Sequence, residues 1–208
     1  RKKNQQKVFL EQELKPRLEE AQKQERVVYF VDAVHFVYGV FVACLWCLKR
    51  IFIPTPSGRS RYNVLGAIDA ITHNFISVCN TTYINAESVC LLLEKIALKH
   101  IQSTVPITLV LDNAKYQHCK FVINKAAELN IELLFLPSYS PNLNIIERLW
   151  KWTKKDCLNC KYYSSFVDFV EAINKSLQKV QNKENKKEMD TQLALNFQLY
   201  DNSIYNRA

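Results

Sequence analysis

Glycine and methionine are scarce in this sequence, whose 208 residues include three glycines and one methionine. With so few glycines there is no glycine-rich loop of the kind that cradles nucleotide phosphates, which argues against a small-molecule α/β enzyme. Long apolar runs are lacking too. None reaches the ~18 residues that a membrane-spanning helix needs, and the longest, 36–48, is interrupted by Gly39. We therefore expect neither a membrane partner nor a small-molecule substrate.

The chain has no initial methionine and begins with the polar run Arg-Lys-Lys-Asn-Gln-Gln. No apolar segment follows this run, so a signal peptide is not expected, and the missing methionine predicts an excised or incomplete chain. The seven cysteines are an odd number and stand mostly among apolar neighbours, as free thiols do in a reducing cytoplasm. Two C-x-x-C pairs occur, Cys44/Cys47 and Cys157/Cys160, but the first lacks the turn residues of a zinc knuckle, so we expect no zinc.

Lysine and arginine exceed aspartate and glutamate by 28 to 20, which gives a net charge of +8. Such an excess suits a polyanionic partner, nucleic acid before a membrane surface, although solubility alone explains part of it.

Apolar patterning predicts strands alternating with helices, hence an α/β domain with one sizeable core. Residues 1–25 carry an apolar helical stripe that Pro16 should kink or split, and we expect an outer helix or linker there rather than a core element. Residues 183–190 look like a solvated charge run, and 191–208 have no assignment. We expect strands at 27–34 (continued by 36–48), 62–72, 73–81, 105–112 and 131–136, and helices at 86–101, after 113, after Asn144 and at 166–180.

Acidic residues interrupt two of the predicted strands. Asp32 lies inside VVYFVDAV, where an unpaired carboxylate is costly; the alternative is a strand-end aspartate that makes a turn or meets an arginine. Asp112 ends VPITLVLD, at the carboxyl edge where α/β sheets form sites; the alternative is that it caps the next helix. Asp69 is the runner-up acid for a metal site.

A third acid, Glu147, belongs to the stretch 136–152, LPSYSPNLNIIERLWKW. Pro137 and Pro141 predict a rigid loop, and Asn144 stands where the N-cap of the following helix is expected. On this helix Glu147 shares the solvent-facing arc with basic residues, while apolar residues fill the rest. Two alternatives explain Glu147 without chemistry: a capping box with Asn144 and an i,i+4 pair with Lys151.

Basic residues near these acids are candidates for contacts with DNA phosphates, which give affinity without reading sequence. Solvated surface charge is the alternative for the two arginines of the 53–61 loop, and His118 is as consistent with a surface residue as with a functional one. The candidates are Arg59, Arg61, Lys115, Arg148, Lys151, Lys154 and Lys155.

A metal site would explain the three acids together. Mg²⁺ prefers carboxylate oxygens, and two such ions about 4 Å apart clamp the attacking and leaving oxygens of a phosphoryl transfer. Two divalent ions, three carboxylates and one scissile phosphodiester together leave a neutral site.

The sequence resembles the DDE transposases, specifically the mariner-like group that includes many bacterial insertion-sequence enzymes. Between Asp112 and Glu147 lie 34 residues, 113 to 146, the interval typical of that group. The likeness covers about residues 26–180. The matching stretches are VVYFVDAVHF, GRSRYNVLGAI, ITLVLDNAKYQHC and LPSYSPNLNIIERLWKWTKK.

This resemblance implies a ribonuclease H-like (retroviral-integrase-like) fold, with a mixed central sheet flanked by helices. It also implies that Asp32, Asp112 and Glu147 form a catalytic triad that binds two Mg²⁺ ions, for which Mn²⁺ is expected to substitute. The implied reaction is cleavage and strand transfer of DNA at transposon ends. Water hydrolyses a phosphodiester and the freed 3′-hydroxyl attacks target DNA, usually at a TA step, without a covalent enzyme–DNA intermediate.

The implied partners are the terminal inverted repeats and the target DNA, on which the protein would assemble as a homodimer at the nucleoid of a bacterial cytoplasm. We expect a helical linker at 1–25, the catalytic domain at 26–182 and a C-terminal tail at 183–208. Ser138 and Ile145 stand where family members often have proline.

Residues 1–25 cannot hold the helix-turn-helix domains with which such transposases recognise inverted repeats. The chain is therefore a catalytic fragment, works with a reading domain on another polypeptide, or belongs to a decayed element. Two other functions stay open: a ribonuclease H-like nuclease without strand transfer, and a catalytically dead DNA-binding remnant.

Overall fold

A mixed five-stranded sheet forms the centre of the protein. The computed structural model describes residues 2–39 and 60–197. The strands are β1 (Val27–Val37), β2 (Arg61–Asp69), β3 (Phe75–Asn80), β4 (Ile107–Leu111) and β5 (Ile131–Phe135). Their order is β3-β2-β1-β4-β5; β1, β2 and β3 pair antiparallel, whereas β4 pairs parallel with both β1 and β5. The central position of β1 means that both of its edges are paired.

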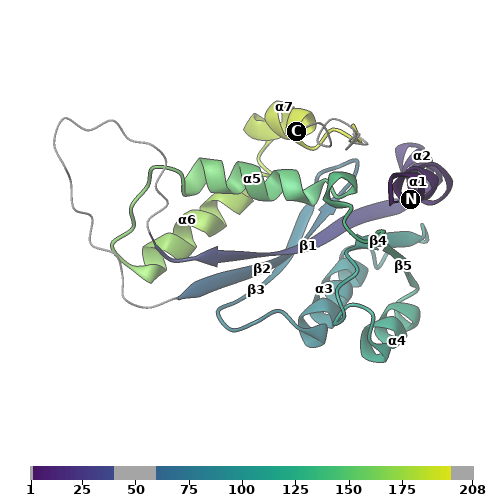
Figure 1. Ribbon diagram of the computed structural model, residues 1–208, viewed down its shortest axis with the longest axis horizontal. Coiled ribbons are helices and arrows are strands. Elements are labelled where there is room, and N and C mark those ends of the chain that lie inside the picture. Colours follow the sequence, from purple (N-terminus) through teal and green to yellow (C-terminus); the bar gives the residue numbers. More distant parts are fainter. Residues whose placement is uncertain (1, 40–59, 198–208) are drawn as a thin grey trace, which may run out of the picture.

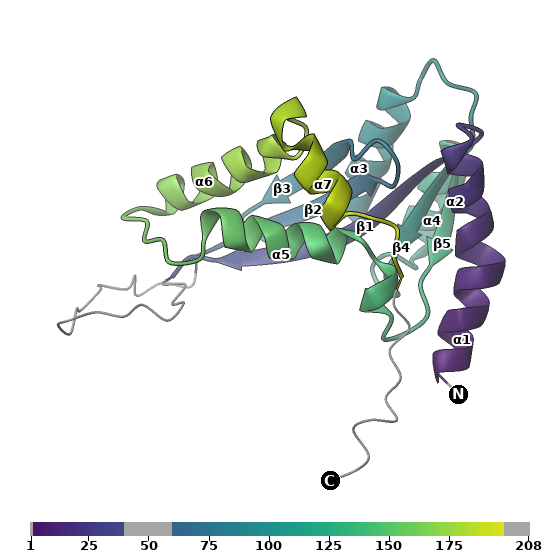
Figure 2. The ribbon, with the colours of Figure 1, turned by 90° about the horizontal axis from the view of Figure 1, so that it is seen from above.

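Helices cover both faces of this sheet, as Figures 1 and 2 show. On one face lie α3 (Ala86–Lys99) and α4 (Lys120–Glu128), which pack on the smaller of two apolar cores. The larger core lies on the other face. Its helices are α1 (Lys2–Phe9), a π-helical turn (Leu10–Leu14), α2 (Lys15–Gln22), α5 (Ile146–Cys157), α6 (Phe166–Lys179) and α7 (Lys186–Gln192). The expected α/β architecture, a mixed central sheet flanked by helices, is confirmed. In the described residues, no helix has the length and apolar character to cross a membrane.

The alternation of side chains along β1 assigns each residue to one of the two cores. Val28, Phe30 and Val34 pack in the larger core with α5 and α6, while Tyr29 and Val31 pack in the smaller one with α3. Because successive strand residues point to opposite faces, Asp32 belongs with Phe30 and Val34 and faces α5.

Local signals predicted several elements correctly. The segments 62–72 and 73–81 form the antiparallel hairpin β2–β3. The side chain of Asn85 caps α3 through a capping box with Ser88, and Ser165 caps α6 by accepting a hydrogen bond from the Asp168 amide at 3.1 Å.

The N-terminal helical stretch contributes to the core, although we expected a linker or outer helix. Leu10, Leu14 and Leu18 are buried in the same cluster as Phe30. The π-helical turn ends at Leu14, two residues before Pro16. Because Pro16 has no N–H to donate to the preceding turn, the chain changes its helical register there instead of breaking. The boundary at 25/26 stays a prediction.

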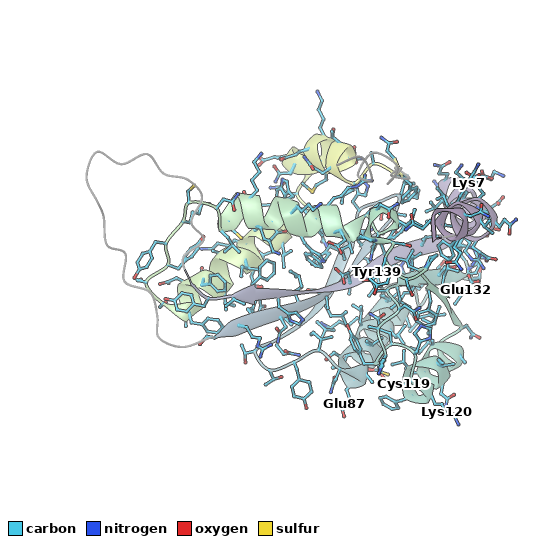
Figure 3. All side chains as sticks on the ribbon, in the orientation of Figure 1. Lys7, Glu87, Cys119, Lys120, Glu132 and Tyr139 are labelled. Carbon is cyan, nitrogen blue, oxygen red and sulfur yellow. The ribbon has the colours of Figure 1, made fainter. Side chains whose placement is uncertain are left out.

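An ionic network fastens this helical stretch to β5. Arg17 Nη2 donates to Glu132 Oε1 at 2.5 Å, and Arg26 Nη1 donates to Glu132 Oε2 at 3.0 Å. Hydrogen bonding to Arg17 lowers the pKa of Glu132 to about 2. Figure 3 shows Glu132 beside the N-terminal helices.

The charged run 183–190 is not merely solvated, which corrects the expectation from the sequence. It forms a 3₁₀ turn and most of α7, and Met189 is buried at 1% exposure. Glu188 accepts a hydrogen bond from Trp152 Nε1 at 2.7 Å. Leu193, directly after α7, is fully buried, and Asp190 lies 3.2 Å from His73 Nδ1, so apolar and polar contacts together dock this polar helix.

Several predictions lie outside the described residues: the continuation of the 36–48 run beyond residue 39, most of the 53–61 loop with Arg59, the Cys44/Cys47 pair and residues 198–208. Of the second C-x-x-C pair, Cys157 is buried and Cys160 is exposed, and both are free.

Gly66 provides a direct test of how tightly α5 packs on the sheet. A Cβ added at Gly66 would lie 2.6 Å from Trp150 Cη2 and 2.7 Å from Phe75 Cε2. We predict that Gly66→Ala lowers the free energy of unfolding by about 1–3 kcal/mol, the usual cost of overpacking a core. Chemical denaturation measures this. Gly39→Ala is the matched control, because no atom of the described residues lies within 4 Å of the added methyl group; an equal loss in both variants would contradict the packing described here.

Candidate functional site

The parallel pairing of β1 and β4 places two aspartates side by side. Phe30 pairs with Val110 at the end of this ladder. Two residues further along each strand come Asp32 and Asp112, which therefore continue the same register and share the face of Phe30 and Val110. Neighbouring strands lie about 4.8 Å apart, so the two carboxyl groups project next to each other toward α5.

The first turn of α5 brings a third carboxyl group to the same place. Glu147 lies in that turn and is half-buried, as are Asp32 and Asp112. The pKa of Asp32 is raised to about 7. Burial is the largest cause, and the neighbouring carboxylates of Asp112 and Glu147 add to it. Burial and the charge of Asp112 also raise the pKa of Glu147, which Lys151 and Lys154 oppose. The three predicted acids thus form one electrostatically coupled group.

Asn144 joins the α5 side of this group to the sheet, a role that its predicted N-cap position did not indicate. The N-cap of α5 is Ile145, without a side-chain hydrogen bond. Asn144 is 2% exposed, and its Nδ2 donates to the Val31 carbonyl at 3.2 Å. Its side chain also hydrogen-bonds to Asp112, which lowers the pKa of that carboxyl group against the rise caused by burial.

The capping-box explanation of Glu147 does not hold, and its pairing with Lys151 is limited to a longer-range attraction. The backbone N–H of Asn144 donates to the Pro141 carbonyl at 3.1 Å, so this N–H is not available for a capping box with the Glu147 side chain. Within residues 2–39 and 60–197, Glu147 forms no ion pair with Lys151.

Trp150 contacts the acids and Tyr116 lies close enough to sense their charge, and neither was predicted from the sequence as a site residue. Trp150 Nε1 donates to Asp32 Oδ2 at 3.0 Å, and its ring meets Phe75 edge-on. Burial raises the pKa of Tyr116, and the charges of Asp32 and Asp112 raise it further. The i+3 spacing of Trp150 from Glu147 places both on neighbouring turns of one helix, but nothing local identifies Asp32 as the acceptor.

The alternatives for the aspartates are settled by their surroundings. Asp112 does not cap the next helix, because α4 begins at Lys120 with Cys119 as its N-cap. In α4, Val122 and Ala126 are buried and Ile123 is 44% exposed.

Asp69, the runner-up acid, has a structural role. Its Oδ1 accepts hydrogen bonds from the amides of Ile71 at 2.8 Å and Thr72 at 2.7 Å. It pairs with Tyr29, three residues before Asp32 in β1, and the two side chains lie on the face of the sheet opposite to Asp32. Asp69 therefore shapes the β2–β3 turn and does not belong to the acidic site.

The acidic site has the charge and ligand types that suit a divalent cation. Among the described residues, none of the three acids forms an ion pair, and only Glu147 has basic residues, Lys151 and Lys154, that lower its pKa from a distance. Carboxylate oxygens are the preferred ligands of Mg²⁺. As placed, however, no three His, Cys, Asp or Glu residues in the described ranges are grouped to hold a metal. Coordination by all three acids would therefore require side-chain movement.

The predicted DNA-contacting residues differ in how available they are. Arg61, Lys115, Lys151, Lys154 and Lys155 are exposed. Arg148 is engaged: its Nη1 donates to the Ala194 carbonyl at 2.6 Å and its Nη2 to the Asn196 carbonyl at 2.5 Å. His118 is exposed and stacks on Phe135, with ring centroids 3.6 Å apart.

Comparison with known proteins identifies relatives of this arrangement. A family profile described as "DDE superfamily endonuclease" matches residues 27–174. No curated protein sequence matches the chain. The fold is similar to that of the Mos1 transposase in its paired-end complex with the left transposon end, at 14% identity and a TM-score of 0.56 over 95% of this chain and 62% of that one.

Two further solved structures support the same fold. The mariner Mos1 paired-end complex with Mg has 14% identity and a TM-score of 0.56, covering 96% of this chain and 64% of that one. The Mos1 strand transfer complex has 15% identity and a TM-score of 0.53, covering 96% and 62%. The chain therefore spans less than two thirds of the length of these Mos1 chains. The ribonuclease H-like fold expected from the sequence is confirmed.

The raised pKa of Asp32 leads to a prediction for the metal-free protein. Because the pKa rises from 3.8 to about 7 on folding, the native state holds a proton that the unfolded state releases between these values. Stability from this group is fully present below pH about 4 and is lost as the pH rises to about 7. Asp32→Asn removes this titration. The unfolding free energy of the variant minus that of the wild type should therefore increase between about pH 4 and pH 7 and stay constant above that range.

Denaturant titrations in EDTA across this pH range measure the difference between the two proteins. A difference that stays flat between about pH 5 and 8 would show that Asp32 is not held in the acidic, half-buried environment described here.

Proposed function

Because the chain belongs to the DDE superfamily endonuclease family, we propose that it is the catalytic domain of a transposase, which cleaves DNA at transposon ends and joins them to target DNA. The observation that carries this proposal is the meeting of Asp32, Asp112 and Glu147, from two strands and a helix, in one coupled acidic group. The Mos1 structures with DNA and with Mg support the same activity here by similarity of fold.

The three acids are the residues proposed to hold the metal. When bound, two divalent ions, Mg²⁺ or Mn²⁺, would activate the attacking oxygen and stabilise the leaving oxygen of a phosphodiester. Asp32 and Asp112 offer adjacent carboxylates from a rigid sheet, and Glu147 approaches from the opposite side. A cation would favour the ionised form of all three, whose pKa values are raised in its absence.

The surrounding residues position these ligands. Trp150 Nε1 donates to Oδ2 of Asp32 and so helps to orient this carboxylate. Asn144 ties the loop before α5 to both β1 and Asp112, so the distance between helix and sheet is set beside the carboxylates. Such supporting hydrogen bonds orient ligands before the metal arrives.

DNA is the proposed partner, both as transposon ends and as target, on which two copies of the protein would assemble at the bacterial nucleoid. The exposed lysines of α5 continue from Glu147 along the same helix. They would contact the phosphates that flank the scissile bond without reading its sequence.

We predict that Asp32→Ala, Asp112→Ala and Glu147→Ala each abolish Mg²⁺- or Mn²⁺-dependent DNA cleavage while the protein stays folded. The measurement is nicking of supercoiled plasmid by protein whose folding is checked by circular dichroism. Asp69→Asn is the control, because it keeps the oxygen that accepts the turn hydrogen bonds and lies away from the acids. Cleavage retained by any of the three alanine variants would remove that residue from the site.

A strand-transfer assay separates the proposed transposase from a nuclease of the same fold. Oligonucleotide ends with a free 3′-hydroxyl are supplied with a target plasmid, so that no first cut is needed. Joined products support the transposase, whereas cleavage without joining favours the nuclease. A protein that binds DNA but neither cuts nor joins would be the catalytically dead remnant.

We predict that replacing Lys151, Lys154 and Lys155 together by alanine weakens DNA binding irrespective of sequence. The slope of log K against log salt should become shallower by up to about 3, since each lost phosphate contact removes about 0.9. Fluorescence anisotropy at several salt concentrations measures it. The control replaces Lys95, Lys99 and Lys120, which lie on α3 and at the start of α4, on the other face of the sheet. Equal effects would mean that only net charge matters.

A further inference from the structure

A pocket opens directly beside Asp112, between two loops at the edge of the acidic site. It has a volume of about 350 Å³ and is lined by residues 112–114 and 137–141. Pockets of about 300 Å³ and more are large enough for small organic ligands. Because Asp112 forms part of its wall, a group bound here would lie next to the phosphate on which the acids are proposed to act.

The lining of this pocket suits an uncharged, flat group rather than a phosphate. No lysine or arginine is among the lining residues, and the Asp112 carboxylate would repel a second anion. Pro137, Pro141 and Ala114 supply apolar surface, while Asn113 supplies an amide of the kind that pairs with base edges in protein–DNA complexes. This combination is the chemistry of a nucleobase site.

Tyr139 presents an aromatic ring at this pocket. It is 81% exposed, the highest value among the large apolar side chains in the described part of the chain. Its φ of 60° is in the left-handed region, which is uncommon for residues other than glycine and occurs most often where surrounding structure imposes it. The loop is held from outside, since Gln6 Nε2 donates to the Tyr139 carbonyl at 3.0 Å. Figure 3 labels Tyr139 in the loop that leads to α5.

We propose that this pocket receives one unstacked nucleobase of the bound DNA, the base of a nucleotide next to the scissile phosphate, and that Tyr139 stacks on it. The proposal rests on the DNA-processing function proposed above and adds a base-binding subsite to it. Stacking on an aromatic side chain tolerates any base, because every base has a π-face. The subsite would therefore hold the strand in place beside the acids without selecting its sequence.

Fluorescence of 2-aminopurine tests this subsite without requiring cleavage. The probe is a single-stranded 12-nucleotide oligothymidine with one 2-aminopurine, titrated with the full chain in Ca²⁺ at low salt. Stacking on Tyr139 should quench the fluorescence on binding. Tyr139→Phe keeps the ring and should quench as the wild type does. Tyr139→Ala should lose the quenching and bind the probe roughly 5- to 150-fold more weakly, the measured range for one base–aromatic stack.

Two controls separate stacking from general damage to the loop. Tyr139→Asn removes the ring but suits a left-handed backbone, so it should behave as Tyr139→Ala while the protein melts normally. Tyr83→Ala removes another exposed tyrosine, 66% exposed on the β3–α3 connection, and should bind and quench as the wild type does.

The outcomes distinguish failure of the subsite from failure of the proposed function. If Tyr139→Ala and Tyr139→Asn bind and quench like the wild type, the subsite is wrong, even where the three acids prove essential for cleavage. A second probe is a strand of the same length in which every nucleotide is abasic. If Tyr139→Ala weakens binding of this abasic strand as much as it weakens binding of the intact probe, base stacking is likewise overturned. Loss confined to the base-bearing probe supports the subsite, whatever the cleavage assay shows.

Discussion

Repulsion among three carboxylates on one face of the sheet is the constraint around which the site is built. The parallel ladder of β1 and β4 carries Asp32 and Asp112 in the same register, and α5 brings Glu147 to them. Burial raises the pKa of each, and the charges of neighbouring carboxylates raise the pKa values of Asp32 and Glu147 further. Grouped carboxylates whose surroundings disfavour their charged forms are rare in a purely structural role. They suit a site for hard cations, because the bound ion offsets the repulsion.

The two sides of helix α5 have different roles at this site. Its buried side, with Leu149, Trp150 and Trp152, fixes it to the sheet, and Trp150 reaches Asp32 across the space left by Gly66. Its exposed side carries the lysines that oppose the rise in the Glu147 pKa. The C-terminal segment then crosses this helix and engages Arg148 through the carbonyls of Ala194 and Asn196, so the basic residues of α5 are not equivalent.

Much of this organisation is visible in the sequence, because strands and amphipathic helices leave periodic patterns. The buried strand around Asp32, the hairpin 62–81 and the caps at Asn85 and Ser165 follow from local chemistry. Long-range partners leave no such pattern. Asn144 has every local feature of an N-cap, yet its side chain bonds to Val31, 113 residues away. Likewise, residues 186–192 form a docked helix through the buried Met189 and through long-range partners of Glu188 and Asp190, which a charge count does not reveal.

The acids themselves could be identified beforehand because buried carboxylates are costly wherever they occur, whereas Trp150, which donates to Asp32, is an ordinary aromatic residue until the fold places it. The most direct test of the account is an anomalous diffraction map of crystals soaked in Mn²⁺. We predict manganese peaks within coordination distance of Asp32, Asp112 and Glu147, and a movement of the Glu147 side chain toward the two aspartates. Manganese bound elsewhere, or three carboxylates that stay apart at saturating metal, would contradict it.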